Sequence, residues 1–346
     1  MTRSRPTLLA LLALLTAAAA LAGCGEREDP QPRSAPVERI DLVLDFFPNA
    51  DHAGLYAAIG TGAFRDVNLD VRPQTPSDPS APLRLLAARR ADLAISYEPE
   101  VLLARDQGLE VVAIGAIVQK PLTSLMSLGD RAIRDPAQLA GKTVGTAGIP
   151  YQSAYLKAIL DKAGVDPADV EEVNVGFNLA PALITKKVDA TLGAFWNYEG
   201  VQLERQGRDP TILRVEELGV PTYNELVVVA REEDARRRGD VLRRFMLALG
   251  RGHRALRENP RSGLRPLLEA NKDLEAGLQA AVVEATMPVF FPEDPDRAFG
   301  HMDEGEWAAY GRWMTENDLL KQREDPRRAL TNEFVPGEGP QAAEGP

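Results

Sequence analysis

Residues 188–200 read VDATLGAFWNYEG, a stretch that joins a short apolar run to a group of aromatic and polar residues. Residues 189–194 form a short apolar run bounded by charge and glycine, which is typical of a buried strand. Three of the next four residues, Phe195, Trp196 and Tyr198, are aromatic, although aromatic residues make up only 6% of the chain. In open α/β sheets ligands bind outside the carboxyl ends of the strands, which is where these rings are expected.

Two polar side chains, Asn197 and Glu199, stand among these aromatic residues. Flat aromatic faces beside an amide and a carboxylate suit a planar, polar, nitrogen-bearing ring. We therefore expect Trp196 and Tyr198 to form aromatic walls and Glu199 to accept hydrogen bonds from a ligand. The alternatives are that the aromatic side chains only pack against the sheet edge and that Glu199 only caps the next helix.

Short apolar runs alternate with helical segments on both sides of this stretch. This alternation predicts an α/β protein with mainly parallel sheets flanked by helices. The expected strands are residues 40–46, 67–72, 92–97, 111–117, 124–128, 142–145, 170–175, 189–194, 212–215 and 226–230. The alternation restarts after residue 120, and a return run near 226 leads into a helical remainder. We therefore expect a two-lobed clamshell that closes around a ligand by hinge motion.

The domain organisation follows from these limits. We expect a signal peptide at 1–23, a flexible tether at 24–36, a first lobe at 37–120 plus 221–334, a second lobe at 121–220, and a disordered tail at 335–346.

The N-terminus has the features of an export signal. Arg3 and Arg5 precede an apolar stretch of 14 residues, 8–21, which is short for a transmembrane helix. It ends in LAGC, which resembles a bacterial lipobox, so Cys24 is expected to carry a lipid. Two or more acyl chains give stable anchoring. The alternative is an ordinary secretory signal, with Cys24 incidental.

The composition and the motifs favour a small-molecule binding protein. The chain has 346 residues and a formal net charge of −11, which argues against a nucleic-acid partner. There is no HExxH, CxxC, Walker A or GxSxG motif, and the three histidines lie far apart in the sequence. We therefore expect no metal, no cofactor and no enzymatic activity.

Polar and aromatic clusters follow several of the expected strands, where one shared cleft would lie. Each cluster alone is more often a helix cap or a turn, but five in matching positions favour a site. The candidate ligand-binding residues are Asp45, Asn49, His52, Ser96, Tyr97, Tyr151, Asn178, Trp196, Asn197, Tyr198 and Glu199.

Several segments resemble the NMT1-type pyrimidine-precursor-binding proteins. The most specific are LDFFPNADHAGLY at 44–56 and FWNYEGVQLE at 195–204, and shorter matches include SYEP, PLTSLM, GKTVG, GFNL, GVPTY and TMP. The resemblance runs from about residue 40 to 334. It implies a periplasmic-binding-protein type II clamshell.

By this resemblance the chain is the lipid-anchored solute-binding component of an ABC importer, connected with thiamine biosynthesis. The implied ligand is a formylaminopyrimidine or hydroxymethylpyrimidine, and the implied partners are the permease and ATPase subunits. We expect a monomer on the outer face of the cell membrane. Two alternatives stay open. One is a carrier for a sulfonate, nitrate or taurine, although binding an anion would favour an arginine in the cleft. The other is a pyrimidine synthase, a class that consumes its own histidine near the place of His52.

Overall fold

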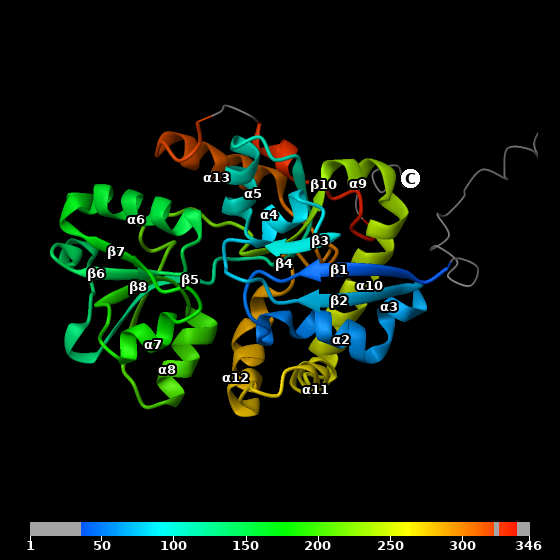
Figure 1. Ribbon diagram of the computed structural model, residues 1–346, viewed down its shortest axis with the longest axis horizontal. Helices are drawn as coiled ribbons and strands as arrows, with labels where there is room; N and C mark the ends of the chain where they lie inside the picture. The colour runs from blue at the N-terminus through cyan, green and yellow to red at the C-terminus, as the bar shows by residue number, and fades with distance from the viewer. Residues whose placement is uncertain (1–35, 322–324, 338–346) are drawn as a thin grey trace, which may run out of the picture. The chain divides into compact units, whose positions relative to one another are not determined.

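The apolar runs build two sheets, which the computed structural model describes within residues 36–321 and 325–337 (Figure 1). The first sheet has the strand order β2-β1-β3-β10-β4. Its strands are β1 (Glu38–Val43), β2 (Leu69–Gln74), β3 (Leu93–Ser96), β4 (Val111–Val118) and β10 (Leu226–Arg231). Every residue of β4 and β10 is buried, which explains why these strands are continuous apolar runs and not alternating ones.

The second sheet has the strand order β7-β6-β8-β5-β9. Its strands are β5 (Thr123–Leu128), β6 (Thr143–Thr146), β7 (Glu171–Asn174), β8 (Ala190–Phe195) and β9 (Pro210–Arg214). The central strand β8 lies within the stretch VDATLGAFWNYEG, and its first five residues are buried.

Both sheets repeat one arrangement. In the first sheet β2, β1 and β3 run parallel, and β10 lies antiparallel beside β3. In the second sheet β7, β6 and β8 run parallel, and β5 lies antiparallel beside β8. Both β10 and β5 are the first strands after the chain crosses from the other sheet. The outermost strands, β4 in the first sheet and β9 in the second, are antiparallel to β10 and β5, so they point in the same direction as the three parallel strands. The prediction of two lobes with mainly parallel sheets is confirmed. Within each sheet the loops after β1 and β3, or after β6 and β8, leave from the same edge.

Helices flank both sheets. Around the first sheet and in the C-terminal part lie α2 (Ala53–Thr61), α3 (Ala63–Asp66), α4 (Pro82–Ala87), α5 (Glu98–Asp106), α9 (Glu232–Arg237), α10 (Gly239–Glu258), α11 (Arg261–Ala270), α12 (Ala276–Thr286) and α13 (Glu304–Glu316). Around the second lie α6 (Pro150–Ala163), α7 (Leu179–Ile184) and α8 (Val201–Arg205).

Short turns of other helix types complete the list. The 3-10 turns are Ala50–His52, Gly129–Arg131, Pro136–Leu139, Pro167–Asp169, Met287–Val289 and Pro326–Ala329. A π-helical turn, Trp196–Gly200, follows β8.

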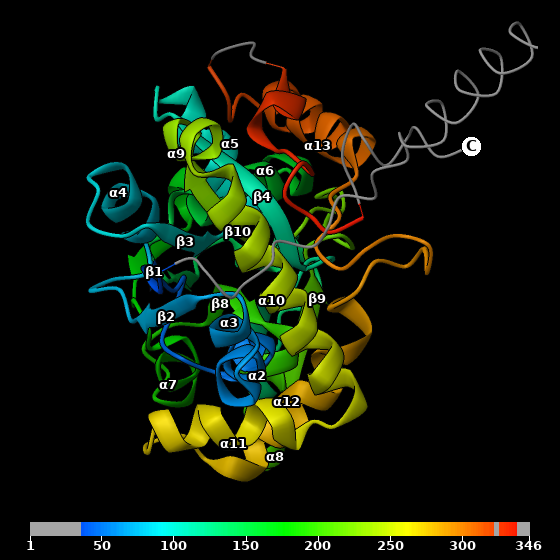
Figure 2. The same cartoon turned by 90° about the vertical axis from the view of Figure 1, so that its right-hand side faces the viewer.

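Helix α2 is held by close backbone contact with α10 and α11 (Figure 2). A Cβ atom on Gly252 of α10 would lie 2.3 Å from the carbonyl oxygen of Gly54, and one on Gly263 of α11 would lie 2.3 Å from that of Ala53. Glycine at both positions lets the helices approach to a distance that no side chain would permit. This packing fixes the loop between β1 and α2, from which several candidate site residues come.

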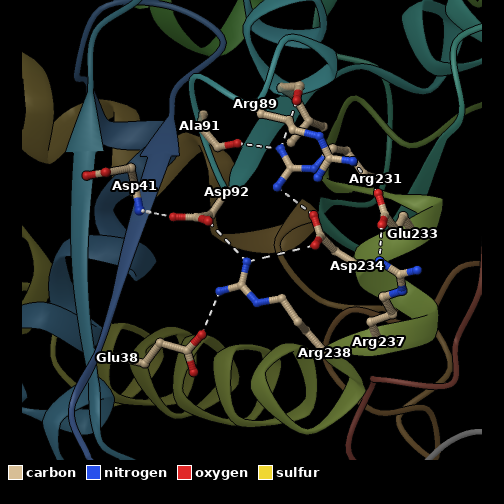
Figure 3. A network of polar contacts seen from close by, with 11 residues as sticks. Glu38, Asp41, Arg89, Ala91, Asp92, Arg231, Glu233, Asp234, Arg237 and Arg238 are labelled. Carbon is tan, nitrogen blue, oxygen red and sulfur yellow. Dashed lines mark hydrogen bonds and ion pairs between the residues drawn. The ribbon is translucent and has the colours of Figure 1, made fainter.

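A network of ion pairs connects the ends of β1, β3 and β10 that lie away from the polar loops (Figure 3). Arg231, at the end of β10, is buried, donates to two backbone carbonyls of α4 and the turn after it, and lies 2.5 Å from Asp234. Arg238 bridges Glu38 at 2.6 Å and Asp92 at 3.1 Å, next to β1 and β3. The pairing neutralises charges that burial would otherwise penalise. It joins three strands of the first sheet at the edge away from the polar loops.

The C-terminal segment packs against the first sheet further along the chain than the sequence predicted. The backbone N–H of Thr331 donates to the carbonyl oxygen of Ala113 in β4. Phe334 and Val335 are buried, with exposed fractions of 1% and 2%. The predicted tail at 335–346 therefore starts too early, because Val335 contributes apolar surface to the core. The remainder, 338–346, lies outside the described residues.

The predicted signal peptide, tether and lipidation site fall on residues 1–35, which also lie outside the described residues. Of the helices that the structure describes, none has the length and apolar character that crossing a membrane requires.

Candidate functional site

A pocket lies where loops of the two sheets meet. The first sheet contributes the loops after β1 and β3. The second contributes the loop after β6, the first turn of α6, the start of α7, the end of β8 and the π-helical turn that follows it. The lining residues are Asp45, Phe46, Asn49, Asp51, Tyr97, Ala147, Ile149, Tyr151, Gln152, Leu179, Gly193, Phe195, Tyr198 and Glu199.

Asp45, which follows β1, is held by hydrogen bonds at both carboxylate oxygens. His52 Nε2 lies 2.8 Å from Oδ1, and the Tyr97 hydroxyl donates to Oδ2 over 2.8 Å. The backbone N–H of Asn49 donates to His52 Nδ1 over 3.2 Å, which leaves the proton of a neutral imidazole on Nε2, facing Asp45. His52 is buried and does not line the pocket. It positions Asp45.

Asn49 shapes the turn that carries the next carboxylate. Its side-chain oxygen accepts the N–H of Asp51 over 2.8 Å, which is the cap of the 3-10 turn Ala50–His52. The cap sets the backbone so that Asp51 reaches the pocket. Asn49 therefore both lines the pocket and orients its neighbour.

Asp51 connects the loops of the two sheets. Its Oδ1 accepts from Asn197 Nδ2 over 2.6 Å, and Thr286 Oγ1 of α12 lies 3.2 Å from the same oxygen. Among the described residues its Oδ2 has no hydrogen-bond partner, although the residue is only 1% exposed. Burial raises the pKa of Asp51 to about 6, because the charged form loses its hydration. Sequence reasoning named its neighbours and missed Asp51 itself.

A β-bulge at Gly193 redirects the end of β8. Ser124 of β5 pairs with Ala194 and Leu125 pairs with Leu192, so Gly193 is left without an opposing residue. Its φ of +110° is a conformation that side-chain-bearing residues rarely adopt. Bulges of this kind bend a strand and re-aim the side chains that follow. The residues after the bulge enter the π-helical turn, a rare element often found at functional sites.

The π-helical turn brings Tyr198 and Glu199 to the pocket. Glu199 Oε2 accepts the N–H of Phe195 over 2.8 Å, so the carboxylate also caps the start of its own turn. Burial raises the pKa of Glu199 to about 7. The Tyr198 hydroxyl accepts from Gln279 of α12 over 3.3 Å, which holds the ring in place.

Trp196 does not line the pocket, in contrast to the prediction that it forms a wall. Its indole N–H donates to the carbonyl oxygen of Pro121 over 3.0 Å, and the guanidinium of Arg214 lies 4.1 Å from the ring centroid. The turn points neighbouring residues in different directions, so only Tyr198 of the two proposed walls faces the pocket. Phe46, from the loop after β1, lies there as well.

Three other candidate residues lie outside the lining. Asn197 is buried and bonded to Asp51, and Ser96 is buried within β3. Asn178 is exposed at the start of α7. Its neighbour Phe177 contacts Phe46, with ring centroids 4.7 Å apart. This aromatic contact between loops of the two sheets was missed, although Phe46 lies inside a cluster that the sequence had marked.

The segments that cross between the sheets are held by Glu225. Its carboxylate accepts the N–H groups of Leu122 over 2.5 Å and Thr123 over 2.9 Å, and the hydroxyl of Tyr223 over 3.0 Å. Leu122 and Thr123 belong to the outgoing crossing and Glu225 to the returning one. The Thr123 hydroxyl lies 3.2 Å from that of Tyr151, which lines the pocket. The crossings are thus connected to the site.

The charged side chains that line the pocket are acidic. Three carboxyl groups line it, and no lysine or arginine does within the part of the chain that the structure describes. Within the described ranges, no group of three or more His, Cys, Asp or Glu side chains is arranged to hold a metal ion. The arrangement suits a ligand that donates hydrogen bonds or carries positive charge, and the aromatic faces suit a flat ring.

Comparisons with known proteins agree on the family. The family model described as NMT1/THI5 like matches residues 49–262. The formylaminopyrimidine-binding protein of Halalkalibacterium halodurans is 33% identical over 314 residues, covering 90% of this chain and 94% of that protein. A 4-amino-5-hydroxymethyl-2-methylpyrimidine phosphate synthase of Legionella pneumophila is 23% identical over 301 residues, covering 86% of this chain and 92% of that protein.

Solved structures agree on the fold. The alkanesulfonate-binding protein of Xanthomonas axonopodis pv. citri, solved bound to MOPS, superposes with a TM-score of 0.66 and 17% identity. The match covers 86% of this chain and 99% of that one. At this identity the likeness concerns the fold alone.

Proposed function

Since the chain belongs to the NMT1/THI5-like family, we propose that it is a solute-binding protein that captures a thiamine pyrimidine precursor of the formylaminopyrimidine or hydroxymethylpyrimidine type. The observation that carries this proposal is the pocket, in which Tyr198 and Phe46 offer ring faces beside Glu199 and no basic side chain is present. The similarity to a formylaminopyrimidine-binding protein supports the same conclusion.

Glu199 is suited to read the amine edge of such a ring. A 4-aminopyrimidine presents an exocyclic N–H donor beside a ring nitrogen. A carboxyl group accepts from the amine with one oxygen and shares a proton with the ring nitrogen through the other, which gives two parallel hydrogen bonds. With its pKa raised to about 7, Glu199 exchanges that proton readily at neutral pH. The pair therefore forms with either partner carrying the proton.

Neither alternative function is favoured by the pocket. A sulfonate, nitrate or other anion would bring negative charge next to Asp51 and Glu199, with no lysine or arginine in the lining to balance it. The synthase alternative depends on His52, but its two ring nitrogens face Asp45 and the Asn49 N–H, and the ring is buried. We therefore propose binding and not catalysis.

The proposal also includes the division of the chain into two lobes and their closure around the solute. We propose a first lobe of residues 37–120 plus 221–334 and a second of 121–220, which the strand membership of the two sheets supports. Closure of the lobes would trap the solute for an ABC permease and its ATPase, with the protein acting as a monomer. Scattering with and without ligand would show compaction on binding, and an unchanged radius would contradict closure.

We further propose that the protein lies outside the cytoplasmic membrane, anchored by lipid on Cys24. The LAGC sequence behind a short apolar stretch supports this. Cys24→Ser should release the protein from the membrane fraction. An unchanged distribution, with no acyl mass on the N-terminal peptide, would refute the anchor.

The ligand itself is tested in two steps. Mass spectrometry of small molecules released from the denatured protein should show an aminopyrimidine. In calorimetry with that compound, Glu199→Gln should lower affinity about tenfold or more, because a charge-assisted pair is lost. Melting should change little, since the amide oxygen still accepts from Phe195. Glu204→Gln, an exposed acid on α8, is the matched control and should bind normally. If Glu199 only caps the turn, affinity holds as well, which would refute the proposed ligand contact.

A further inference from the structure

Asn197 does not line the pocket, and its side chain instead joins the two proposed lobes. We propose that Asn197 is a positioning residue for solute retention: its amide bonds to Asp51 and Thr286 hold the lobes closed and so set the rate at which the solute leaves. The proposal rests on the proposed function, because the lobe limits and the closure around a solute belong to it.

Three buried side chains, those of Asn197, Asp51 and Thr286, meet across the lobes, and we call them the interlobe cluster. Asn197 follows β8 in the second lobe and Asp51 follows β1 in the first. Thr286 ends α12, a helix of the first lobe that lies beside α8 of the second (Figure 1). Asn197 Nδ2 lies 2.6 Å from Asp51 Oδ1 and 2.6 Å from Thr286 Oγ1, so each of its two N–H groups has its own acceptor.

The acceptor on α12 is held in place by its own helix. The Thr286 hydroxyl donates to the carbonyl oxygen of Val282 over 2.7 Å, which leaves a lone pair of Oγ1 for the N–H of Asn197. The same Oγ1 lies 3.2 Å from Asp51 Oδ1. The exposed fraction is 1% for Asp51 and 0% for Asn197 and Thr286. The interlobe cluster is therefore shielded from water on all three members.

The bonds of Asn197 exist only while the lobes are closed, because both of its partners belong to the other lobe. In an open form water would solvate the Asp51 carboxylate. Closure removes that water, and the resulting burial raises the pKa of Asp51, so the carboxylate depends on protein donors. Without the Asn197 amide, closure would leave a buried carboxylate with Thr286 as its one side-chain hydrogen-bond partner among the described residues. That loss raises the free energy of the closed form and not of the open one.

Other polar contacts on this side of the pocket are weaker. Arg205 of α8 and Glu275 of α12 lie 3.8 Å apart, but both side chains are exposed, and solvent weakens such pairs. Gln279 of α12 donates to the Tyr198 hydroxyl over 3.3 Å, a long bond between neutral groups. The bond from Asn197 to a buried carboxylate is shorter and assisted by charge. It is therefore the contact between α12, the Asp51 turn and the second lobe whose loss should matter most.

Loss of the interlobe cluster should act on release and not on capture. The solute enters an open form, in which the bonds of Asn197 are absent, so the association rate should not depend on them. It leaves after the lobes reopen, which requires these bonds to break. Asn197 and Thr286 do not line the pocket, so the loss of a solute contact cannot explain faster release. A residue that only supported its own turn would instead change the stability of the ligand-free protein.

The test measures association and dissociation of 4-amino-5-hydroxymethyl-2-methylpyrimidine by stopped flow. Asn197→Ala should speed release about tenfold or more, since a bond to a carboxylate is lost, and should change association by less than about twofold. Thr286→Val keeps the shape of the side chain and should speed release several-fold, for the loss of one neutral bond. Thr185→Val is the matched control, because its hydroxyl also bonds a carbonyl four residues back at a helix end, over 2.8 Å, but is exposed. It should leave both rates unchanged.

The outcomes separate this proposal from the proposed function. Normal release in Asn197→Ala and Thr286→Val overturns the role of Asn197 while the wild type still binds the pyrimidine, and so does a lower melting temperature of the ligand-free variants with normal release. If Asn197→Ala does not fold, Thr286→Val decides alone.

A wild type that binds no pyrimidine contradicts the proposed function, and scattering of the ligand-free protein then tests the interlobe cluster. Asn197→Asp places a second carboxylate against Asp51 and should increase the radius of gyration above that of the wild type. Equal radii would overturn the proposal.

Discussion

Replacing Gly193 by alanine tests whether the bulge in β8 builds the pocket. Two costs are expected. The first is backbone strain, because a φ of +110° is unfavourable for a residue with a side chain, at about 1–2 kcal/mol. The second is a clash, because the new Cβ would lie 2.1 Å from Gln152 Nε2.

Relieving that clash has its own cost. Gln152 is 1% exposed, and its Oε1 accepts the buried N–H of Ala147 over 2.8 Å. Moving the amide away leaves this N–H without an acceptor, which costs about 1–3 kcal/mol. Gly193→Ala should therefore lose about 2–5 kcal/mol of unfolding free energy. It should also weaken ligand binding, since the displaced side chain lines the pocket.

A matched control separates strain from clash. Gly207 also has a positive φ, +68°, but its Cβ would meet nothing within 4 Å. Gly207→Ala should thus cost only about 1 kcal/mol of backbone strain and leave binding unchanged. Urea unfolding of both variants gives the difference. In a Gln152→Ala background the Cβ has room, so adding Gly193→Ala should cost only the strain, and the coupling in this cycle should be about 1–3 kcal/mol. Equal costs for Gly193→Ala and Gly207→Ala, with normal binding, would refute the reasoning.

Three further predictions concern Glu225 in the segment that returns to the first sheet, His253 in the core, and Phe177, which contacts the pocket residue Phe46. Glu225→Ala should cost about 3–6 kcal/mol in urea unfolding, because two buried backbone N–H groups and the hydroxyls of Thr123 and Tyr223 lose this acceptor, whereas Glu225→Gln keeps an acceptor and should cost much less; similar losses would argue against this role. Burial lowers the pKa of His253 from 6.5 to about 4, so its stabilising contribution is complete above 6.5 and is lost as the pH falls toward 4. The free-energy advantage of wild type over His253→Gln should shrink by about 3 kcal/mol across that range, and a constant difference would contradict the shift. Phe177→Ala removes the ring contact with Phe46 and should speed ligand release several-fold in stopped flow, since such pairs contribute about 0.5–1.5 kcal/mol, while Asn178→Ala should leave the rate unchanged.

Much of the fold could be predicted because it depends on local patterns. Buried strands such as β10 are short apolar runs, and the alternation of such runs with helices determines the class and the predominance of parallel strands. Turn chemistry is local as well: Asn49 caps the turn that it precedes, as short polar residues do. The edges of elements moved by only a few residues, as at β1, which ends at Val43 and not at residue 46.

The site could be predicted as a region but not side chain by side chain. The clusters after β1, β3, β6 and β8 all contribute to the pocket, because strands that run parallel bring their carboxyl-end loops to one edge. Within those clusters, composition alone favoured Trp196 as a wall and His52 as a contact. Neither lines the pocket. Their neighbours Phe46 and Asp51 do.

The sequence by itself therefore determined which elements form and which loops come together at the pocket, since hydrophobic period and turn residues act over a few positions. Only the tertiary structure decided which side chains face the pocket. The bulge at Gly193 exists because of pairing with β5, some 70 residues away in the chain, and it sets the direction of every residue in the turn that follows. The orientation of Asp51 depends on Asn197, which lies 146 residues further along. No local pattern carries such long-range contacts, because the bulge forms only when β5 and β8 pair within the second sheet, and the Asp51–Asn197 bond forms only when loops of the two sheets meet.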